Sequence, residues 1–222
     1  MFPFVLSAVD ARVLGVLIEK QITTPDYYPL TLNGLVTACN QKTNRDPVME
    51  LDEETVLQSL DGLKAHHLVW QIKTAGSRTQ KYEHNLKDVA DLQVSELAVL
   101  CELLLRGPQT AGELRSRTAR LTEFHGLAAV EHTLKKLMEH EKGPFAARLP
   151  RQPGHKECRY VQLLSGSEEY PEDAASDPGI AAEDFSGLER DRIADLERRV
   201  AVLSDELDRL KSQFGEFKRQ FE

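Results

Sequence analysis

The chain has 222 residues, of which 41% are hydrophobic and 29% are charged, and its formal net charge is −8. This length suits one large domain or two small domains with an appendage, and the hydrophobic fraction is sufficient for a buried core. No apolar run approaches membrane-spanning length and the N-terminal residues lack a basic signal-peptide segment, so we expect a cytoplasmic protein with no membrane contact. Cys39, Cys101 and Cys158 are too widely spaced for a disulfide framework or a zinc site, which indicates reduced thiols.

The negative charge is concentrated in the C-terminal part of the sequence. Residues 1–90 carry a net charge of −2, residues 91–165 carry +2, and residues 166–222 carry −8. Because the first two segments are close to neutral, the overall charge does not exclude a local basic patch that attracts nucleic acid.

One pattern of helices occurs twice in the first two segments. The apolar helix pattern that contains Val13 returns 86 residues later at Val99, and a third helix pattern that contains Val56 returns 74 residues later at Val130. Between them a shorter helix pattern repeats at an offset of 79 residues, and each third helix is followed by two strand-like runs around a turn. Three helices followed by a hairpin are typical of the winged helix-turn-helix. The sequence therefore predicts winged-helix domains at residues 1–90 and 91–165.

The C-terminal segment predicts a linker and a coiled coil. Residues 166–186 are rich in Ser, Glu, Asp, Pro and Ala, which is typical of an acidic flexible linker. From residue 187 to 222 apolar residues recur at alternating steps of three and four, as in a dimeric coiled coil, although a helix folded back on the protein body is the alternative. The predicted dimerisation residues are Ile193, Leu196, Val200, Leu203, Leu207, Leu210, Phe214 and Phe217.

A family resemblance rests on the region from Tyr28 to Met49. The runs Tyr-Pro-Leu-Thr-Leu-Asn and Asn-Gln-Lys-Thr-Asn-Arg-Asp-Pro in this region resemble the signature of the YceH family of bacterial proteins, and the similarity extends over roughly residues 4–164. The resemblance implies paired winged-helix domains and implies little about function.

The predicted third helices differ in charge. In the first domain this helix starts with Asp52, Glu53 and Glu54, and three carboxylates at this end would repel DNA phosphates. The second domain carries a cluster of basic residues, the arrangement that neutralises phosphates, although a solvated basic face is the simpler alternative. Its candidate nucleic-acid contacts are Arg115, Arg117, Arg120, Lys135, Lys136, Arg148, Arg151 and Lys156.

The loop from Asn40 to Pro47 joins the second and third helices of the first domain. Its amide and basic side chains suit either contacts with DNA or local stabilisation of the loop. We assign Asn40 and Asp46 to structural roles and interpret Lys42 and Arg45 as further candidate nucleic-acid contacts.

The sequence as a whole predicts a mainly α-helical protein with small β-hairpins, built from tandem winged helix-turn-helix domains and a C-terminal coiled-coil helix. The leading hypothesis is a DNA-binding transcriptional regulator that binds double-stranded DNA as a homodimer. The alternative is a winged-helix module or scaffold that binds a protein partner. No Gly-rich phosphate loop, nucleophile elbow or metal-binding motif occurs, so we expect neither an enzyme nor a cofactor or metal site.

Overall fold

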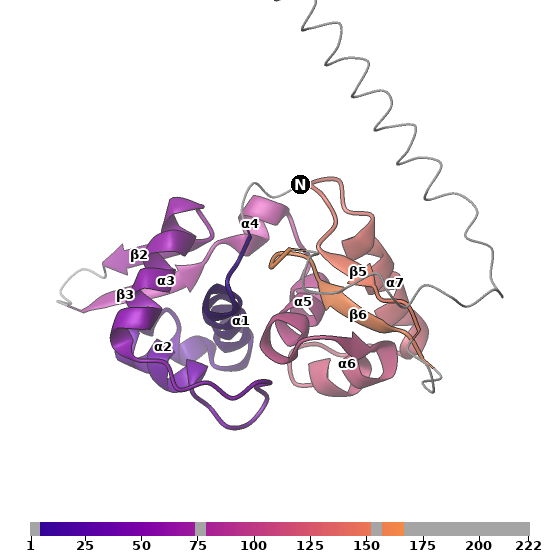
Figure 1. The fold of residues 1–222 in the computed structure, drawn as a ribbon, viewed down its shortest axis with the longest axis horizontal. Helices are drawn as coiled ribbons and strands as arrows, with labels where there is room; N and C mark the ends of the chain where they lie inside the picture. Colours follow the sequence, from indigo (N-terminus) through magenta and orange to yellow (C-terminus); the bar gives the residue numbers. More distant parts are fainter. Residues whose placement is uncertain (1–4, 74–78, 152–156, 167–222) are drawn as a thin grey trace, which may run out of the picture. The chain divides into compact units, whose positions relative to one another are not determined.

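The computed structural model of the chain describes residues 5–73, 79–151 and 157–166. In these residues the protein is mostly helical, with seven α-helices and two small antiparallel sheets of three strands each. Figure 1 shows two similar groups of helices and strands on either side of a central pair, α1 (Ala8–Thr23) and α5 (Val94–Arg106). None of the described helices is long and apolar enough to cross a membrane.

The first half of the described chain, which we call the first repeat, is arranged around α1. This helix starts at a capping box, in which the Ser7 hydroxyl accepts a hydrogen bond from the Asp10 N–H. Its strands form a sheet in the order β1-β3-β2, with Leu30 opposite Tyr82. The elements after α1 are η1 (Pro25–Tyr27), β1 (Leu30–Thr31), α2 (Leu32–Cys39), α3 (Glu53–Ala65), β2 (Val69–Lys73) and β3 (Gln80–His84).

The second half, which we call the second repeat, follows the short connecting helix α4 (Leu86–Ala90) and is arranged around α5. Its sheet has the order β4-β6-β5, with Gln109 opposite Tyr160. The elements after α5 are β4 (Gln109–Thr110), α6 (Ala111–Thr118), α7 (Leu127–Met138), β5 (Ala146–Arg148) and β6 (Arg159–Gln162).

The two repeats have the same order of elements. Their first helices begin 86 residues apart, their second helices 79 residues apart and their third helices 74 residues apart, which are the offsets of the sequence pattern. In each repeat a two-residue strand before the second helix pairs with the last strand, and a tyrosine occupies the equivalent position of that last strand. The repetition therefore extends from the helices to the register of the sheets.

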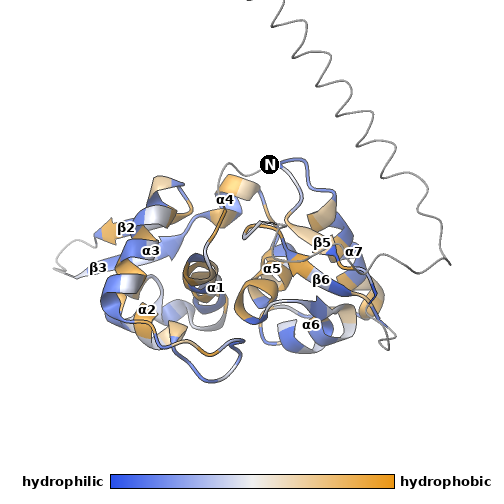
Figure 2. Cartoon of the chain, viewed as in Figure 1, coloured by the Kyte–Doolittle hydropathy of each residue, from blue (hydrophilic) through white to orange (hydrophobic). Residues whose placement is uncertain are grey.

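The two repeats pack together along α1 and α5. Figure 2 shows that both helices are strongly hydrophobic, and Val13, Leu17 and Leu100 are completely buried. The backbones approach closely at Gly15, whose carbonyl oxygen accepts a hydrogen bond from the Cys101 thiol at 3.3 Å. The repeats thus share one hydrophobic core rather than forming two separate ones.

Part of the predicted organisation lies outside the described residues. This applies to the candidate Lys156, to nearly all of the predicted linker at 166–186, and to the predicted coiled coil at 187–222. The predicted dimerisation residues that lie outside are Ile193, Leu196, Val200, Leu203, Leu207, Leu210, Phe214 and Phe217.

Candidate nucleic-acid interface

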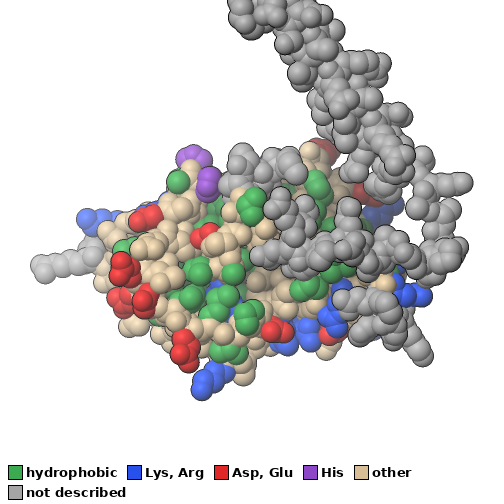
Figure 3. Space-filling model, viewed as in Figure 1, with side chains coloured by type: hydrophobic (Ala, Val, Ile, Leu, Met, Phe, Trp, Pro, Cys, Tyr) green, Lys and Arg blue, Asp and Glu red, His purple; other side chains and the backbone are tan. Residues whose placement is uncertain are grey.

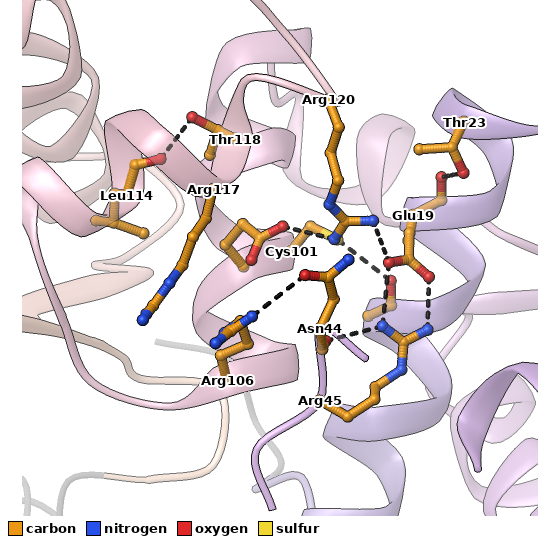
Figure 4. Close-up of polar contacts among 12 residues, drawn as sticks. Glu19, Thr23, Asn44, Arg45, Cys101, Arg106, Leu114, Arg117, Thr118 and Arg120 are labelled. Carbon is orange, nitrogen blue, oxygen red and sulfur yellow. Dashed lines mark hydrogen bonds and ion pairs between the residues drawn. The ribbon is translucent and has the colours of Figure 1, made fainter. Parts of the chain in front are cut away.

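A cluster of three buried charges and one that reaches the surface links the two repeats beside the α1–α5 contact (Figure 4). Glu19 lies in α1, Glu102 lies in α5, Arg45 lies in the loop after α2, and Arg120 follows α6. Arg45 and Arg120 each approach one carboxylate oxygen of Glu19 to 2.5 Å, and Arg120 also reaches Glu102 at 2.6 Å. We call these four residues the buried charge cluster. It joins segments that are far apart in the sequence, because Glu19 and Arg120 are 101 residues apart.

Arg45 occupies the interior of the protein and not its surface. Its guanidinium is completely buried, and besides Glu19 it donates hydrogen bonds to the backbone carbonyl of Ala38 and to the side chain of Gln41. A DNA phosphate cannot reach this group unless the loop unfolds. We therefore remove Arg45 from the candidate nucleic-acid contacts and assign it to the contact between the repeats.

Arg120 is also engaged within the protein, although 30% of its side-chain surface is exposed to solvent. Its two terminal nitrogens are bound to the carboxylates of Glu19 and Glu102. Because these two carboxylates already compensate the charge of Arg120, we no longer regard Arg120 as a candidate nucleic-acid contact.

The rest of the loop from Asn40 to Pro47 is largely structural. The Asn40 amide binds both the N–H and the carbonyl of Leu51, which supports its structural assignment. The backbone N–H of Asp46 donates to the carbonyl of Leu105 in α5 at 3.0 Å, while the Asp46 side chain is exposed. Lys42 is exposed and stays a candidate contact.

Arg12, Glu19 and Glu102 are among the buried charged residues that were not candidates from the sequence. Glu19 and Glu102 complete the buried charge cluster, and Arg12 of α1 is 2% exposed and donates to the backbone carbonyls of Cys39 and Pro47. The sequence does contain a signal for them, since each interrupts an otherwise apolar stretch of a core helix. A charge inside such a stretch requires a buried partner, because its desolvation is costly.

The pKa values of the two glutamates of the cluster are shifted in opposite directions. Burial alone would raise the pKa of Glu19, but the hydrogen bonds and charges of Arg45 and Arg120 outweigh it and lower the pKa. Burial raises the pKa of Glu102, and Arg120 offsets this effect only in part. Glu102 also has one buried carboxylate oxygen without a hydrogen-bond partner among the described residues. The charge of Glu19 is therefore fully compensated by its partners, whereas the charge of Glu102 is compensated only in part.

The second repeat retains most of its basic candidates at the surface. Arg117 is partly buried, and it donates to Gln109 at 2.7 Å and lies 3.3 Å from Glu113. Lys135 and Lys136 of α7 make only long ion pairs, at 3.8 and 4.0 Å. The candidates exposed to solvent are Arg115, Lys135, Lys136, Arg148 and Arg151.

The third helices differ at their N-termini. In α3 the carboxylate of Asp52 accepts a hydrogen bond from the Thr55 N–H, and Glu53 and Glu54 follow. The side chain of Thr55, together with this N–H, lowers the pKa of Asp52. In α7 the N-cap is Gly126, which provides no side-chain hydrogen bond, and the first turn contains no acidic residue. The positive dipole end of α7 therefore carries no acidic side chain, whereas that of α3 is already neutralised by carboxylates.

Surface charge follows the same division. Figure 3 shows Asp and Glu side chains gathered at the end of the molecule that holds α2 and α3, and Lys and Arg side chains gathered around the second repeat. The second repeat is thus the more basic of the two, in agreement with the net charge of +2 over residues 91–165.

Comparison with known proteins places this chain among close relatives. Residues 6–155 match the family described as "Protein of unknown function, DUF480". A UPF0502 protein of Hahella chejuensis is 49% identical over 213 residues, which cover 94% of each chain. A UPF0502 protein of Geobacter sulfurreducens is 49% identical over 217 residues, which cover 98% of each chain. The UPF0502 protein YceH of Salmonella paratyphi A is 46% identical over 215 residues, which cover 95% of this chain and 98% of that protein.

Proposed function

The chain belongs to the DUF480 family of UPF0502 proteins, as its resemblance to YceH indicates, and we propose that it is a DNA-binding regulator built from two winged-helix domains. In each repeat, three helices are followed by a hairpin whose last strand pairs with a short strand before the second helix. This is the order of elements in a winged helix, in which the third helix enters the major groove and the hairpin contacts the backbone. A fold alone does not define a function, so the proposal depends on the surface of the second repeat.

One observation carries the proposal: the third helix of the second repeat has no side-chain cap or acidic residue at its N-terminus, and it carries exposed basic residues in its last turn. Lys135 and Lys136 lie on α7, and Arg148 lies on the adjoining hairpin strand β5. All three are exposed, and the ion pairs of the two lysines are long enough to be exchanged for phosphate contacts. In this proposal the first repeat serves mainly as a scaffold, because its α3 presents carboxylates at the end that would meet DNA.

The first prediction concerns the charge of this surface. We expect the full chain to bind a fluorescein-labelled duplex in fluorescence anisotropy, with an affinity that falls by at least about 10²-fold between about 50 and about 200 mM salt. The double substitution Lys135→Glu and Arg148→Glu should weaken binding at least about tenfold, because each reversal removes a phosphate contact and adds repulsion. The matched control is Lys73→Glu, on the corresponding hairpin of the first repeat, which should leave the affinity unchanged. Absence of binding at low salt, or equal binding by the double variant, contradicts the proposal.

Dimerisation through the C-terminal heptads completes the proposal, since a dimer would allow two copies to occupy paired half-sites. We predict that the full chain has twice the mass of a monomer in size-exclusion chromatography with light scattering. Leu203→Glu, at the predicted centre of the heptad seam, should reduce this to the monomer mass, because a charge at a d position is not tolerated in the seam. Ser204→Glu changes the neighbouring residue outside the seam and should leave the dimer intact. A monomeric wild type, or a dimeric Leu203→Glu variant, argues against this part of the proposal.

A second candidate function is protein binding by the first repeat. Two of the exposed large apolar side chains of this repeat lie on α3 and the adjoining strand β2: Leu57 is 39% exposed and Trp70 is 47% exposed. They accompany the acidic start of α3, and aromatic side chains at the surface are typical of protein interfaces. This candidate is favoured if the full chain binds no duplex at low salt.

A further inference from the structure

The loop that carries Lys42 touches the second repeat at the C-terminal end of α5. Asn44 accepts a hydrogen bond from the Arg106 guanidinium through its side-chain oxygen at 3.2 Å, and Figure 4 shows these two side chains pointing toward one another. Two residues further along, the backbone N–H of Asp46 binds the carbonyl of Leu105. These contacts hold the exposed loop of the first repeat against basic residues of the second repeat.

Arg117 belongs to the same edge of the molecule. It donates to the side-chain oxygen of Gln109, and the nitrogen of that amide in turn donates to the carbonyls of Glu102 and Gly107. Arg117 is thereby held near the C-terminal end of α5, and Figure 4 shows Arg106 and Arg117 on the same side of the buried charge cluster.

Positive charge on this edge exceeds negative charge. The described hydrogen-bond partner of the Arg106 guanidinium is an uncharged amide, and its Nε has none. Glu113 is shared between Arg117 and Arg159, at 3.3 Å from each. The residues joined by these contacts and by the buried charge cluster are the cations Lys20, Arg45, Arg106, Arg117, Arg120 and Arg159 and the anions Glu19, Asp46, Glu102 and Glu113. The exposed Lys42 of the same loop brings the surplus to three positive charges.

We propose that this edge is a second phosphate-binding surface, on which the DNA backbone contacts Lys42 of the first repeat and Arg106 and Arg117 of the second. The inference rests on the proposed function and extends it, because it assigns a DNA contact to the family's signature loop and places part of the DNA path across both repeats. Arginine and lysine suit this role, since guanidinium groups bind phosphate oxygens in pairs and ammonium groups bind them as point charges.

A purely structural explanation exists for the arginines, because cations near the C-terminus of a helix are stabilised by its dipole. It does not extend to Lys42. This side chain is exposed, lies in the loop beyond the end of α2, and makes no ion pair with any of the described residues. Lys42 is therefore the residue that separates a phosphate-binding edge from simple helix stabilisation.

The test compares the salt dependence of duplex binding for the full chain and four variants, again by fluorescence anisotropy. Lys42→Gln and Arg117→Gln should each reduce the slope of log affinity against log salt by about 0.9, the value for one lost phosphate contact. Arg106→Lys keeps the charge and should retain most of the slope. Lys87→Gln removes an exposed charge from α4 and is the matched control, for which no change is expected.

The outcomes distinguish this inference from the proposed function. If Lys42→Gln and Arg117→Gln leave the slope unchanged while Lys135→Glu with Arg148→Glu weakens binding, the edge is not a phosphate-binding surface and the proposed function stands. If the edge variants lose affinity without a change in slope and also melt at lower temperature, their role is structural and the inference is overturned. If the wild type binds no duplex at low salt, both are overturned.

Discussion

Glu19→Gln is expected to lower the free energy of unfolding by about 3 kcal/mol, because removing one partner of a buried ion pair leaves the other charge uncompensated. Both Glu19 oxygens are occupied, one by Arg45 and the other by Arg120 and Arg45. Glutamine retains one oxygen acceptor but directs its NH₂ group at a guanidinium, and Arg45 then remains buried without a counter-ion. Urea unfolding of the full chain, followed by circular dichroism at neutral pH, measures the loss.

Glu102→Gln provides the matched comparison within the same cluster and should change the unfolding free energy by less than about 1 kcal/mol. One Glu102 oxygen binds Arg120, which glutamine can still do, while the other has no described partner. Burial already disfavours the charged form of Glu102. Removing this charge therefore removes its desolvation penalty together with its attraction to Arg120. Equal losses for the two variants would show that the four charges act as one unit, contrary to this assignment.

The pH dependence of these two variants should have opposite signs. The pKa of Glu19 is lowered in the folded protein, so its contribution is present above the ordinary pKa of glutamate and is lost as the pH falls through the lowered value. The stability difference between wild type and Glu19→Gln should therefore shrink in acid. The pKa of Glu102 is raised, so its contribution is present at low pH and is lost as the pH rises through the raised value. The free energy of unfolding of the wild type should thus rise relative to that of Glu102→Gln as the pH falls from neutral.

The repeated helices were predictable from the sequence because their signal is local. Apolar residues at helical spacing mark α1 and α5, and the offsets of 86, 79 and 74 residues match the starts of all three helix pairs. The mixed, mostly helical architecture with two hairpins was likewise predicted and is confirmed in the described residues. The assignment of winged helices and of the coiled coil stays a prediction.

The buried charge cluster could not be predicted in the same way. A run of polar residues such as Gln41 to Asp46 looks like an exposed loop, and nothing local shows that the middle of it turns inward. Arg45 is buried because it forms an ion pair with Glu19 of α1. Arg120, which is 101 residues from Glu19 in the sequence, binds the same carboxylate. Partners at such separation are set by the packing of the two repeats. An exposed residue such as Lys42 needs no buried partner, so its position at the surface could be predicted from the polar composition of the loop.

Gly15→Ala should lower the free energy of unfolding by about 1–3 kcal/mol, because α1 and α5 approach closely at this position. A Cβ atom there would lie 2.9 Å from Leu105 Cδ2 and 3.1 Å from Leu104 Cβ, which is too close for carbon atoms. The higher helix propensity of alanine, worth up to about 1 kcal/mol, offsets part of the loss. Urea unfolding again measures the change.

Gly62→Ala is the matched control, since Gly62 also lies within a helix but a Cβ there would meet nothing within 4 Å. It should stabilise the protein by about 0.5–1 kcal/mol through helix propensity alone. The double variant Gly15→Ala with Leu105→Ala should lose less free energy of unfolding than the two single variants lose together, because the shortened side chain of residue 105 makes room for the new methyl group. If Gly15→Ala instead behaves like Gly62→Ala, the two helices can shift apart at no cost. The repeats would then be free to adjust to one another, and a DNA path across both could not depend on their rigid packing.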